Sequence, residues 1–145
     1  VLTRYWVDKD HPAPGQGGQT YASLVCGPDD TLYIAYRQWR AGVDPYHQGQ
    51  LFAALSVQRK PRDGDWGPAQ PVVIPPCAGY SIYYHKLTID RRGRLFLSYS
   101  YWTSDTTYQD DFPERYHHRA LLLSADGAKT WKLATTADLG GKPTR

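Results

Sequence analysis

The sequence contains no methionine, only two cysteines and a single glutamate among its 145 residues. No run of apolar residues is long enough to cross a membrane as a helix. No segment combines the charged start, apolar centre and small-residue cleavage site of a signal peptide. No stretch longer than a turn repeats its apolar residues at helical spacing. The lack of any helical period favours an all-β chain. The lack of methionine, with Val1 at the start and polar, Gly/Pro-rich ends, predicts a processed product or a fragment.

The two cysteines, Cys26 and Cys77, have the spacing of neither a metal site nor a redox pair. Cys26 falls within an expected strand and Cys77 in an expected loop, so we favour two free thiols over a disulfide. We expect Cys26 to be a small core residue. The acidic loop residues could hold calcium, but their spacing matches no EF-hand loop, so we expect no metal and no cofactor. These residues are Asp105, Asp110, Asp111 and Glu114.

The chain has little excess of either charge, with 17 basic and 14 acidic residues and a formal net charge of +3. Charges of both signs are interspersed, so nothing indicates nucleic acid as a partner. The small positive excess favours an anionic partner slightly.

Two stretches of the chain match each other without a gap at a constant offset of 63 residues. They are residues 24–39 and 87–102, in which two leucines, a tyrosine and a tryptophan recur in place. Outside them, Tyr21 falls on Tyr84. A repeat built from short β-rich segments is typical of solenoids and propellers.

Each repeat is expected to form four strands connected as a meander. The second strands are apolar on both alternating faces, which predicts that both faces of each sheet are covered. We therefore predict an all-β fold with two four-stranded antiparallel blades of a β-propeller, as a fragment of a larger propeller, because closure needs about four to eight blades. The expected strands are 21–26, 32–39, 51–58, 67–74, 84–89, 95–102, 118–124 and 131–136.

This organisation divides the chain into four parts. Residues 21–76 are expected to be the first blade and 77–139 the second. Residues 1–20 are expected to be the tail of a preceding blade or a linker, and 140–145 the start of a next blade or a linker. The missing blades would come from the same propeller or from identical chains.

The candidate site lies at the end of the sheets that carries the long loops, 40–50, 75–83 and 103–116, because function concentrates in long loops on a rigid scaffold. His85 stands where the first repeat has Ala22, and Arg37 stands where the second has Ser100, so the blades do not require either side chain. Histidine suits proton transfer near neutral pH, and a guanidinium can clamp a carboxylate. A channel-lining histidine and a solvated arginine are the plainer interpretations.

Other residues are expected near the same end. His117 and His118 point to opposite faces by strand alternation, which argues against a metal site built from both. The remaining candidates are Tyr101 as a proton donor, and Trp39, Trp102, Tyr84 and His47 as substrate-binding residues.

Residues 124–131 read Ser-Ala-Asp-Gly-Ala-Lys-Thr-Trp. They resemble the Asp-box of bacterial neuraminidase repeats, Ser-x-Asp-x-Gly-x-Thr-Trp, with Ala128 in place of the usual glycine. The resemblance implies a structural role, in which the serine and aspartate cap a turn and the tryptophan packs under the blade.

The whole chain resembles the neuraminidase-repeat propeller proteins, a group that includes sialidase-like proteins and ulvan-lyase-like polysaccharide lyases. Residues 84–93 match the lyases' outline of a histidine before an innermost strand, then an Asp/Gly turn. Where such lyases often carry a second histidine, this chain has Tyr101 and Trp102.

The resemblance implies a lyase that cleaves an acidic, uronate-containing polysaccharide by β-elimination. Arg37 would neutralise the carboxylate, His85 would be the base and Tyr101 the acid. A sialidase-like glycoside hydrolase is an alternative, for which Glu114 is the only glutamate. A non-catalytic glycan-binding propeller, with Trp39 and Trp102 stacking on sugars, is another. A protein of this group is expected to be secreted, periplasmic or at the cell surface.

Overall fold

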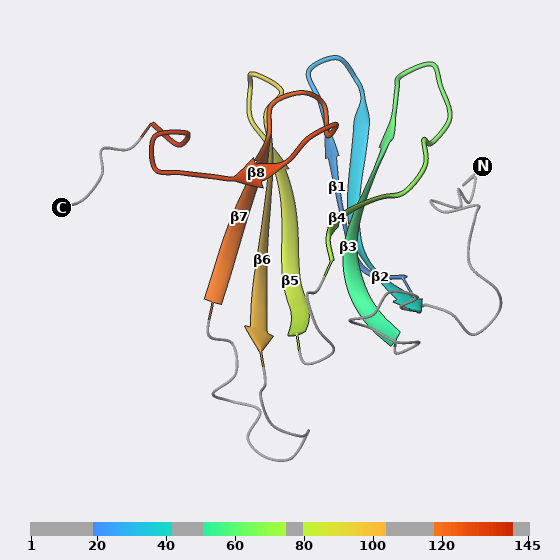
Figure 1. Cartoon of the computed structure of the whole chain (residues 1–145). Coiled ribbons are helices and arrows are strands. Elements are labelled where there is room, and N and C mark those ends of the chain that lie inside the picture. Colours follow the sequence, from blue (N-terminus) through green and yellow to red (C-terminus); the bar gives the residue numbers. More distant parts are fainter. Residues whose placement is uncertain (1–18, 42–50, 75–79, 104–117, 141–145) are drawn as a thin grey trace.

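The computed structural model describes residues 19–41, 51–74, 80–103 and 118–140, which form two four-stranded antiparallel sheets and no helix (Figure 1). Within this part of the chain there is thus no helix that could span a membrane. In each sheet the strands follow one another in chain order, which confirms the predicted meander. The first sheet contains β1 (Gln19–Cys26), β2 (Leu32–Ala41), β3 (Leu51–Lys60) and β4 (Gln70–Val73). The second contains β5 (Tyr80–Ile89), β6 (Leu95–Thr103), β7 (His118–Ser124) and β8 (Lys132–Leu133).

The strand bounds agree with the sequence pattern most closely at β7. The fourth strands are shorter than expected: β4 starts at Gln70, after Gly67 and Pro68, and β8 has two residues. β4 nevertheless contains Pro71, which is tolerated because β4 lies at the edge of its sheet. β1 begins two residues earlier than expected and β5 begins four residues earlier, at Tyr80.

The turns β1–β2, β5–β6 and β7–β8 lie at one end of the sheets (Figure 1), and an aspartate side chain accepts hydrogen bonds in each of them. Asp29 accepts hydrogen bonds from the backbone N–H and the hydroxyl of Thr31. Asp90 accepts from the backbone N–H groups of Arg92 and Arg94. Asp126 does the same in the turn between β7 and β8, so each hairpin has its turn backbone satisfied locally.

The first strand of each sheet carries a β-bulge at the same place. Thr20 pairs with Arg37 and Ser23 with Ala35, so two residues of β1 lie opposite one of β2. In the second sheet Tyr83 pairs with Ser100 and Lys86 with Ser98, which leaves Tyr84 and His85 opposite Tyr99. The repeat therefore extends to this irregularity, which shifts the side-chain alternation along both strands.

The two sheets pack through β5, which contacts β1, β2 and β3. The interface contains a hydrophobic core to which both sheets contribute, including Leu55 and Val57 from the first and Leu87 and Leu97 from the second. Polar bonds cross it as well. The Leu87 N–H donates to Ser23 Oγ at 3.0 Å, and the Ser23 hydroxyl donates to the Leu87 carbonyl at 3.4 Å.

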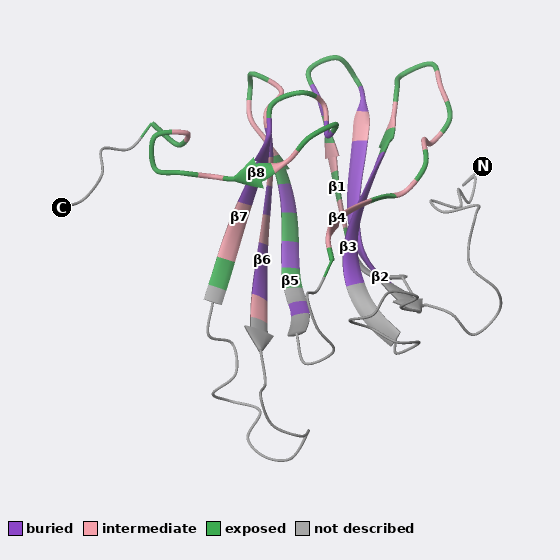
Figure 2. Ribbon diagram, in the orientation of Figure 1, coloured by how far each residue is buried: buried purple, intermediate pink, exposed green. Residues whose placement is uncertain are grey.

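Burial follows this arrangement (Figure 2). β2 is buried on both faces from Tyr33 to Gln38, as its doubly apolar pattern predicted. β6 alternates instead between buried and half-buried residues over its first half. The expectation that Cys26 is a core residue is wrong: this free thiol is exposed at the end of β1, because its alternation places it on the face turned away from the second sheet.

Candidate functional site at the crossing of β2 and β5

Arg37 and His85 each reach from their own sheet to the backbone of the other. Arg37 of β2 donates from Nη1 to the carbonyl oxygen of Ile82 in β5 at 3.2 Å. His85 of β5 places Nε2 3.3 Å from the carbonyl oxygen of Ala35 in β2. Both side chains are only 8% exposed. We call this pair of reciprocal contacts the sheet crossing.

The partner of His85 decides how its ring can act. A carbonyl oxygen only accepts hydrogen bonds, so Nε2 must carry a proton to bond Ala35. In the neutral ring Nδ1 is then the basic nitrogen, and a proton taken up there turns the ring into an imidazolium without breaking the Ala35 contact. The carbonyl acceptor thus selects the neutral tautomer of His85 that carries its proton on Nε2.

Two tyrosines of β6 lie beside the crossing. Tyr101 pairs across the ladder with Ile82, whose carbonyl holds Arg37. Tyr101 is half-buried and packs against the core between the sheets. Its ring lies 6.0 Å from that of Tyr99, at a tilted angle. The structure therefore brings a guanidinium, an imidazole and a phenol into one region between the sheets.

Tyr84, next to His85 in the bulge, is exposed and strained. Its side chain is 65% exposed, and its φ of +48° lies in the left-handed region that bulky residues rarely adopt. Such strain costs about 1–3 kcal/mol and persists where the surrounding structure enforces it, often at functional sites. The bulge turns Tyr84 outward and His85 inward from adjacent positions.

For the other candidate residues, the structure describes either the backbone alone or nothing. Trp39 ends up in β2 and Trp102 in β6, but their side chains lie outside what the structure describes. His47 and the acidic loop residues from Asp105 to Glu114 also fall outside the described residues. His85 differs from its expected place at the start of a strand: it lies mid-strand, because β5 continues through the bulge to Tyr80.

The sequence analysis missed the main-chain partners of the site and the position of Tyr99 beside it. No residue type signals a carbonyl acceptor, so Ala35 and Ile82 could not be found from the sequence. Tyr99 opposes the two bulge residues and packs in the same core as Tyr101, which becomes visible only once the register of β5 is known. In the described part of the chain no group of three or more His, Cys, Asp or Glu residues could hold a metal.

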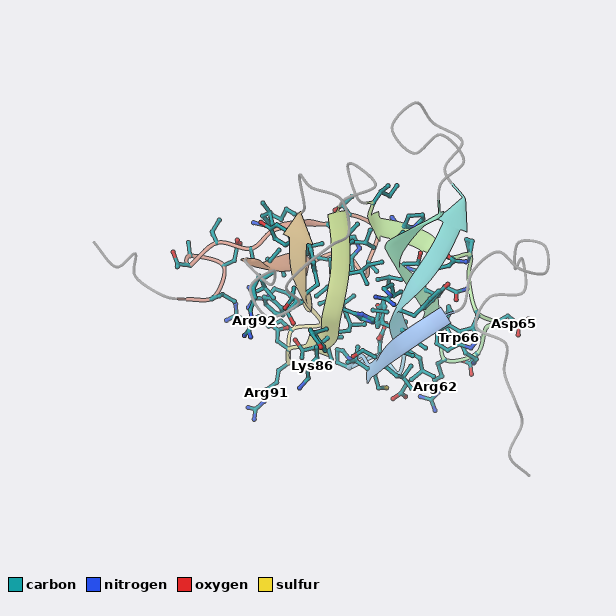
Figure 3. All side chains as sticks on the ribbon, turned by 90° about the horizontal axis from the view of Figure 1, so that it is seen from below. Arg62, Asp65, Trp66, Lys86, Arg91 and Arg92 are labelled. Carbon is teal, nitrogen blue, oxygen red and sulfur yellow. The ribbon has the colours of Figure 1, made fainter. Side chains whose placement is uncertain are left out.

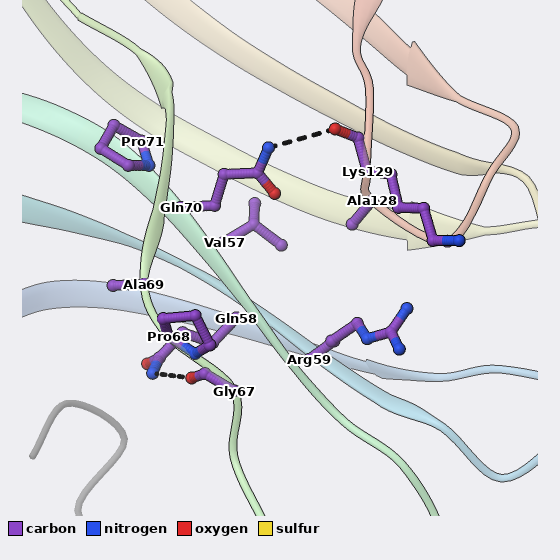
Figure 4. Close-up of a pocket in the computed structure, with 11 residues that line it drawn as sticks. Val57, Gln58, Arg59, Gly67, Pro68, Ala69, Gln70, Pro71, Ala128 and Lys129 are labelled. Carbon is purple, nitrogen blue, oxygen red and sulfur yellow. Dashed lines mark hydrogen bonds between the residues drawn. The ribbon is translucent and has the colours of Figure 1, made fainter.

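A groove lies near the turn between β7 and β8 (Figure 4). This groove of about 470 Å³ separates the β3–β4 edge from that turn, and Gln70 Nε2 crosses it to donate to the Lys129 carbonyl at 3.2 Å. Arg59 and Lys129 supply its cations. Among the described residues its lining contains no histidine, carboxylate, tyrosine or tryptophan.

The sequence matches no model of a known protein family, and no curated protein matches it. Among solved structures, a protein of unknown function from Dyadobacter fermentans has a similar fold, with a TM-score of 0.56 and 13% sequence identity. The similarity covers 81% of this chain and 35% of that one, so this chain spans about a third of that protein's length. A likeness at this identity concerns the fold alone.

Proposed function

We propose that this chain forms two adjacent blades of a carbohydrate-active β-propeller that cleaves an acidic polysaccharide by β-elimination. The observation that carries the proposal is the sheet crossing, where a cation from one sheet and a base from the next lie together. This reaction needs both, in addition to an acid.

The stacking of the sheets supports the propeller. The first strand of one sheet, β1, lies beside the first strand of the other, β5, and Ser23 contacts Leu87 there. At the other edge, Gln70 of β4 meets Lys129 in the turn before β8. Two sheets over 35% of the similar structure's length would correspond to about six in a whole chain, within the range in which propellers close.

The chemistry assigns one step to each group. Nδ1 of His85 takes the proton from C5 of the uronate, the released electron pair forms the C4–C5 double bond, and the bond from C4 to the leaving oxygen breaks. Tyr101 gives its phenolic proton to that oxygen. Arg37 neutralises the carboxylate, which makes the C5 proton removable. Because Arg37 and His85 are buried, the substrate must open the crossing to reach Nδ1.

Tyr84 supports a sugar substrate. An exposed aromatic ring held in a strained conformation beside the base offers a flat apolar surface, and sugar rings stack on such surfaces. We take the strained backbone at Tyr84 as support for a functional position, because strained residues cluster at functional sites.

The test replaces His85 in the natural full-length protein. His85→Gln keeps a donor toward Ala35 but removes the basic nitrogen, so it should lower formation of the unsaturated product at least about 100-fold with little loss of stability. Ultraviolet absorbance of the new double bond measures the rate on uronate-containing polysaccharides. Undiminished product formation would reject the assignment of His85.

One observation favours a non-catalytic function instead. At the crossing, Arg37 and His85 each hydrogen-bond a backbone carbonyl of the other sheet, as purely structural side chains do. In that case the wild type would form no product, and Tyr84→Ala would still weaken glycan binding in titration calorimetry. Retention of full affinity by Tyr84→Ala would exclude this tyrosine from either function.

A further inference from the structure

The face of β1 that is turned away from the second sheet is far more exposed than the equivalent face of β5 in the repeat. Leu24 is 58% exposed, whereas its repeat counterpart Leu87 is 1% exposed. Ala22 is likewise exposed, while His85 at the same repeat position is buried. The two strands have the same bulge and the same alternation of side chains. Their difference in exposure therefore comes from what covers each face.

The covering of β5 is known from the structure. Its inward residues face the first sheet, where Ser23 bonds the backbone of Leu87 and the side chains of Leu55 and Val57 join the same core. In β1 the alternate residues, Ser23 and Val25, are the ones turned to the second sheet. The residues Ala22, Leu24 and Cys26 therefore form a strip on the opposite face, which we call the outer strip.

We infer that the outer strip of β1 is the docking surface for a further four-stranded sheet of the same polypeptide, which covers it as the first sheet covers β5. The repeat indicates that the covering element is another sheet, because Leu24 is equivalent to Leu87, which the contact between the two sheets buries. The similar structure, of which this chain spans 35%, has room for such sheets. This inference rests on the propeller architecture proposed above, but it does not depend on the reaction.

A second copy of this chain fits the strip less well. If copies stacked head to tail, the outward face of the second sheet would lie on Leu24. That face carries Lys86 where the first sheet has Ser23, and Thr88 where it has Val25, both exposed. Figure 3 shows Lys86 on the outside of the second sheet. Burying its ammonium against leucine without an anionic partner is costly, so identical copies are disfavoured.

Thiol labelling tests the inference in the natural full-length protein. Leu24→Cys in a Cys26→Ser background is compared with Leu139→Cys, since Leu139 is 57% exposed and no repeat counterpart indicates a cover. We expect the thiol at position 24 to react at least about 100-fold more slowly than the thiol at position 139, as read by peptide mass mapping. Equal rates would overturn the inference.

Two further measurements decide the source of the cover. Solution mass at the labelling concentration should give a monomer, and a protected thiol in an oligomer would overturn the assignment to the same polypeptide. If Leu24→Cys fails to fold, Leu24→Asp and Leu139→Asp replace it: the first should lower the Tm by several times more than the second. Similar small shifts would show that the strip is open to solvent.

Discussion

Asp126 holds the turn between β7 and β8 through four hydrogen bonds to its carboxylate. It accepts from the hydroxyl and N–H of Thr130, from the Ser124 hydroxyl and from the Lys129 N–H. Bonds to Thr130 are the main cause that lowers the pKa of Asp126 from 3.8 to about 2. The Lys132 ammonium and Thr135 lower the pKa of Asp138 to about 2 in the same way.

These depressed pKa values predict acid sensitivity. A carboxyl group whose pKa is lower in the folded state stabilises the fold above its unfolded pKa, and this contribution is lost as the pH falls through the folded value. Stability should therefore decline between about pH 4 and pH 2. In urea unfolding at pH 5 and at pH 2.5, Asp126→Asn should lower the stability at pH 5 and flatten the difference between the two pH values.

Asp63 provides the matched control, because it is an exposed turn aspartate for which the structure gives no hydrogen bond among the described residues. Asp63→Asn should keep the wild-type pH dependence. An unchanged dependence in Asp126→Asn would show that its carboxylate does not stabilise the turn.

For single residues, the sequence singled out the side chains of the crossing but not the atoms to which they hydrogen-bond. The contrast between His85 and Ala22, and between Arg37 and Ser100, was enough to single out the two side chains of the crossing. What they bond was not predictable, because a main-chain carbonyl looks the same in every residue.

Among the elements, the turn before β8 depends on two consecutive positive φ angles, +71° at Gly127 and +68° at Ala128. Glycine adopts this conformation freely, whereas a side chain is strained in it. Ala128 bears that strain with its methyl buried in the core cluster. A Cβ at Gly127 would also lie 3.3 Å from the Tyr33 hydroxyl oxygen, closer than ordinary contact.

Gly127→Ala should therefore destabilise the protein by about 1–2 kcal/mol, as measured by urea unfolding. Gly64→Ala is the control, since its φ is not positive and its nearest neighbour is Pro61 at 3.4 Å. That change should stay within about 0.5 kcal/mol. Equal losses in both variants would mean that backbone strain is not the cause.

Most strands could be predicted from alternation and turn residues, but β5 shows where alternation fails. The bulge puts two residues, Tyr84 and His85, opposite Tyr99, so the period of two is broken there. A pattern read backwards from Ile89 stops at Tyr84, and the strand's first four residues are lost. The register on both sides is clear only once the partner strand is known.

For the molecule as a whole, Ser23 supplies a hydrogen-bonded contact between the sheets. Its hydroxyl satisfies both the N–H and the carbonyl of Leu87 on the open edge of β5. Ser23→Ala should cost about 1 kcal/mol, because it removes the acceptor of a partly buried N–H. Ser98→Ala is the control, since the Ser98 hydroxyl bonds Lys86 within one sheet in an exposed place. Urea unfolding should separate the two variants, and equal losses would contradict a role between sheets.

The contact between the sheets was predicted only in outline. The doubly apolar pattern of β2 predicted that both of its faces would be covered. The repeat suggested that the cover would be a second sheet of the same kind. The choice of β5 as the contacting strand depends on long-range packing, which no local pattern in the sequence encodes.

Both donors of the crossing end on carbonyl oxygens of the main chain, at Ala35 and Ile82. Such acceptors persist whatever side chains the neighbouring sheet carries. A repeat can therefore exchange an imidazole for a methyl group, or a guanidinium for a hydroxyl, while its neighbour keeps its own ladder intact. Chemistry at this position can diverge from one repeat to the next on a scaffold that need not change with it.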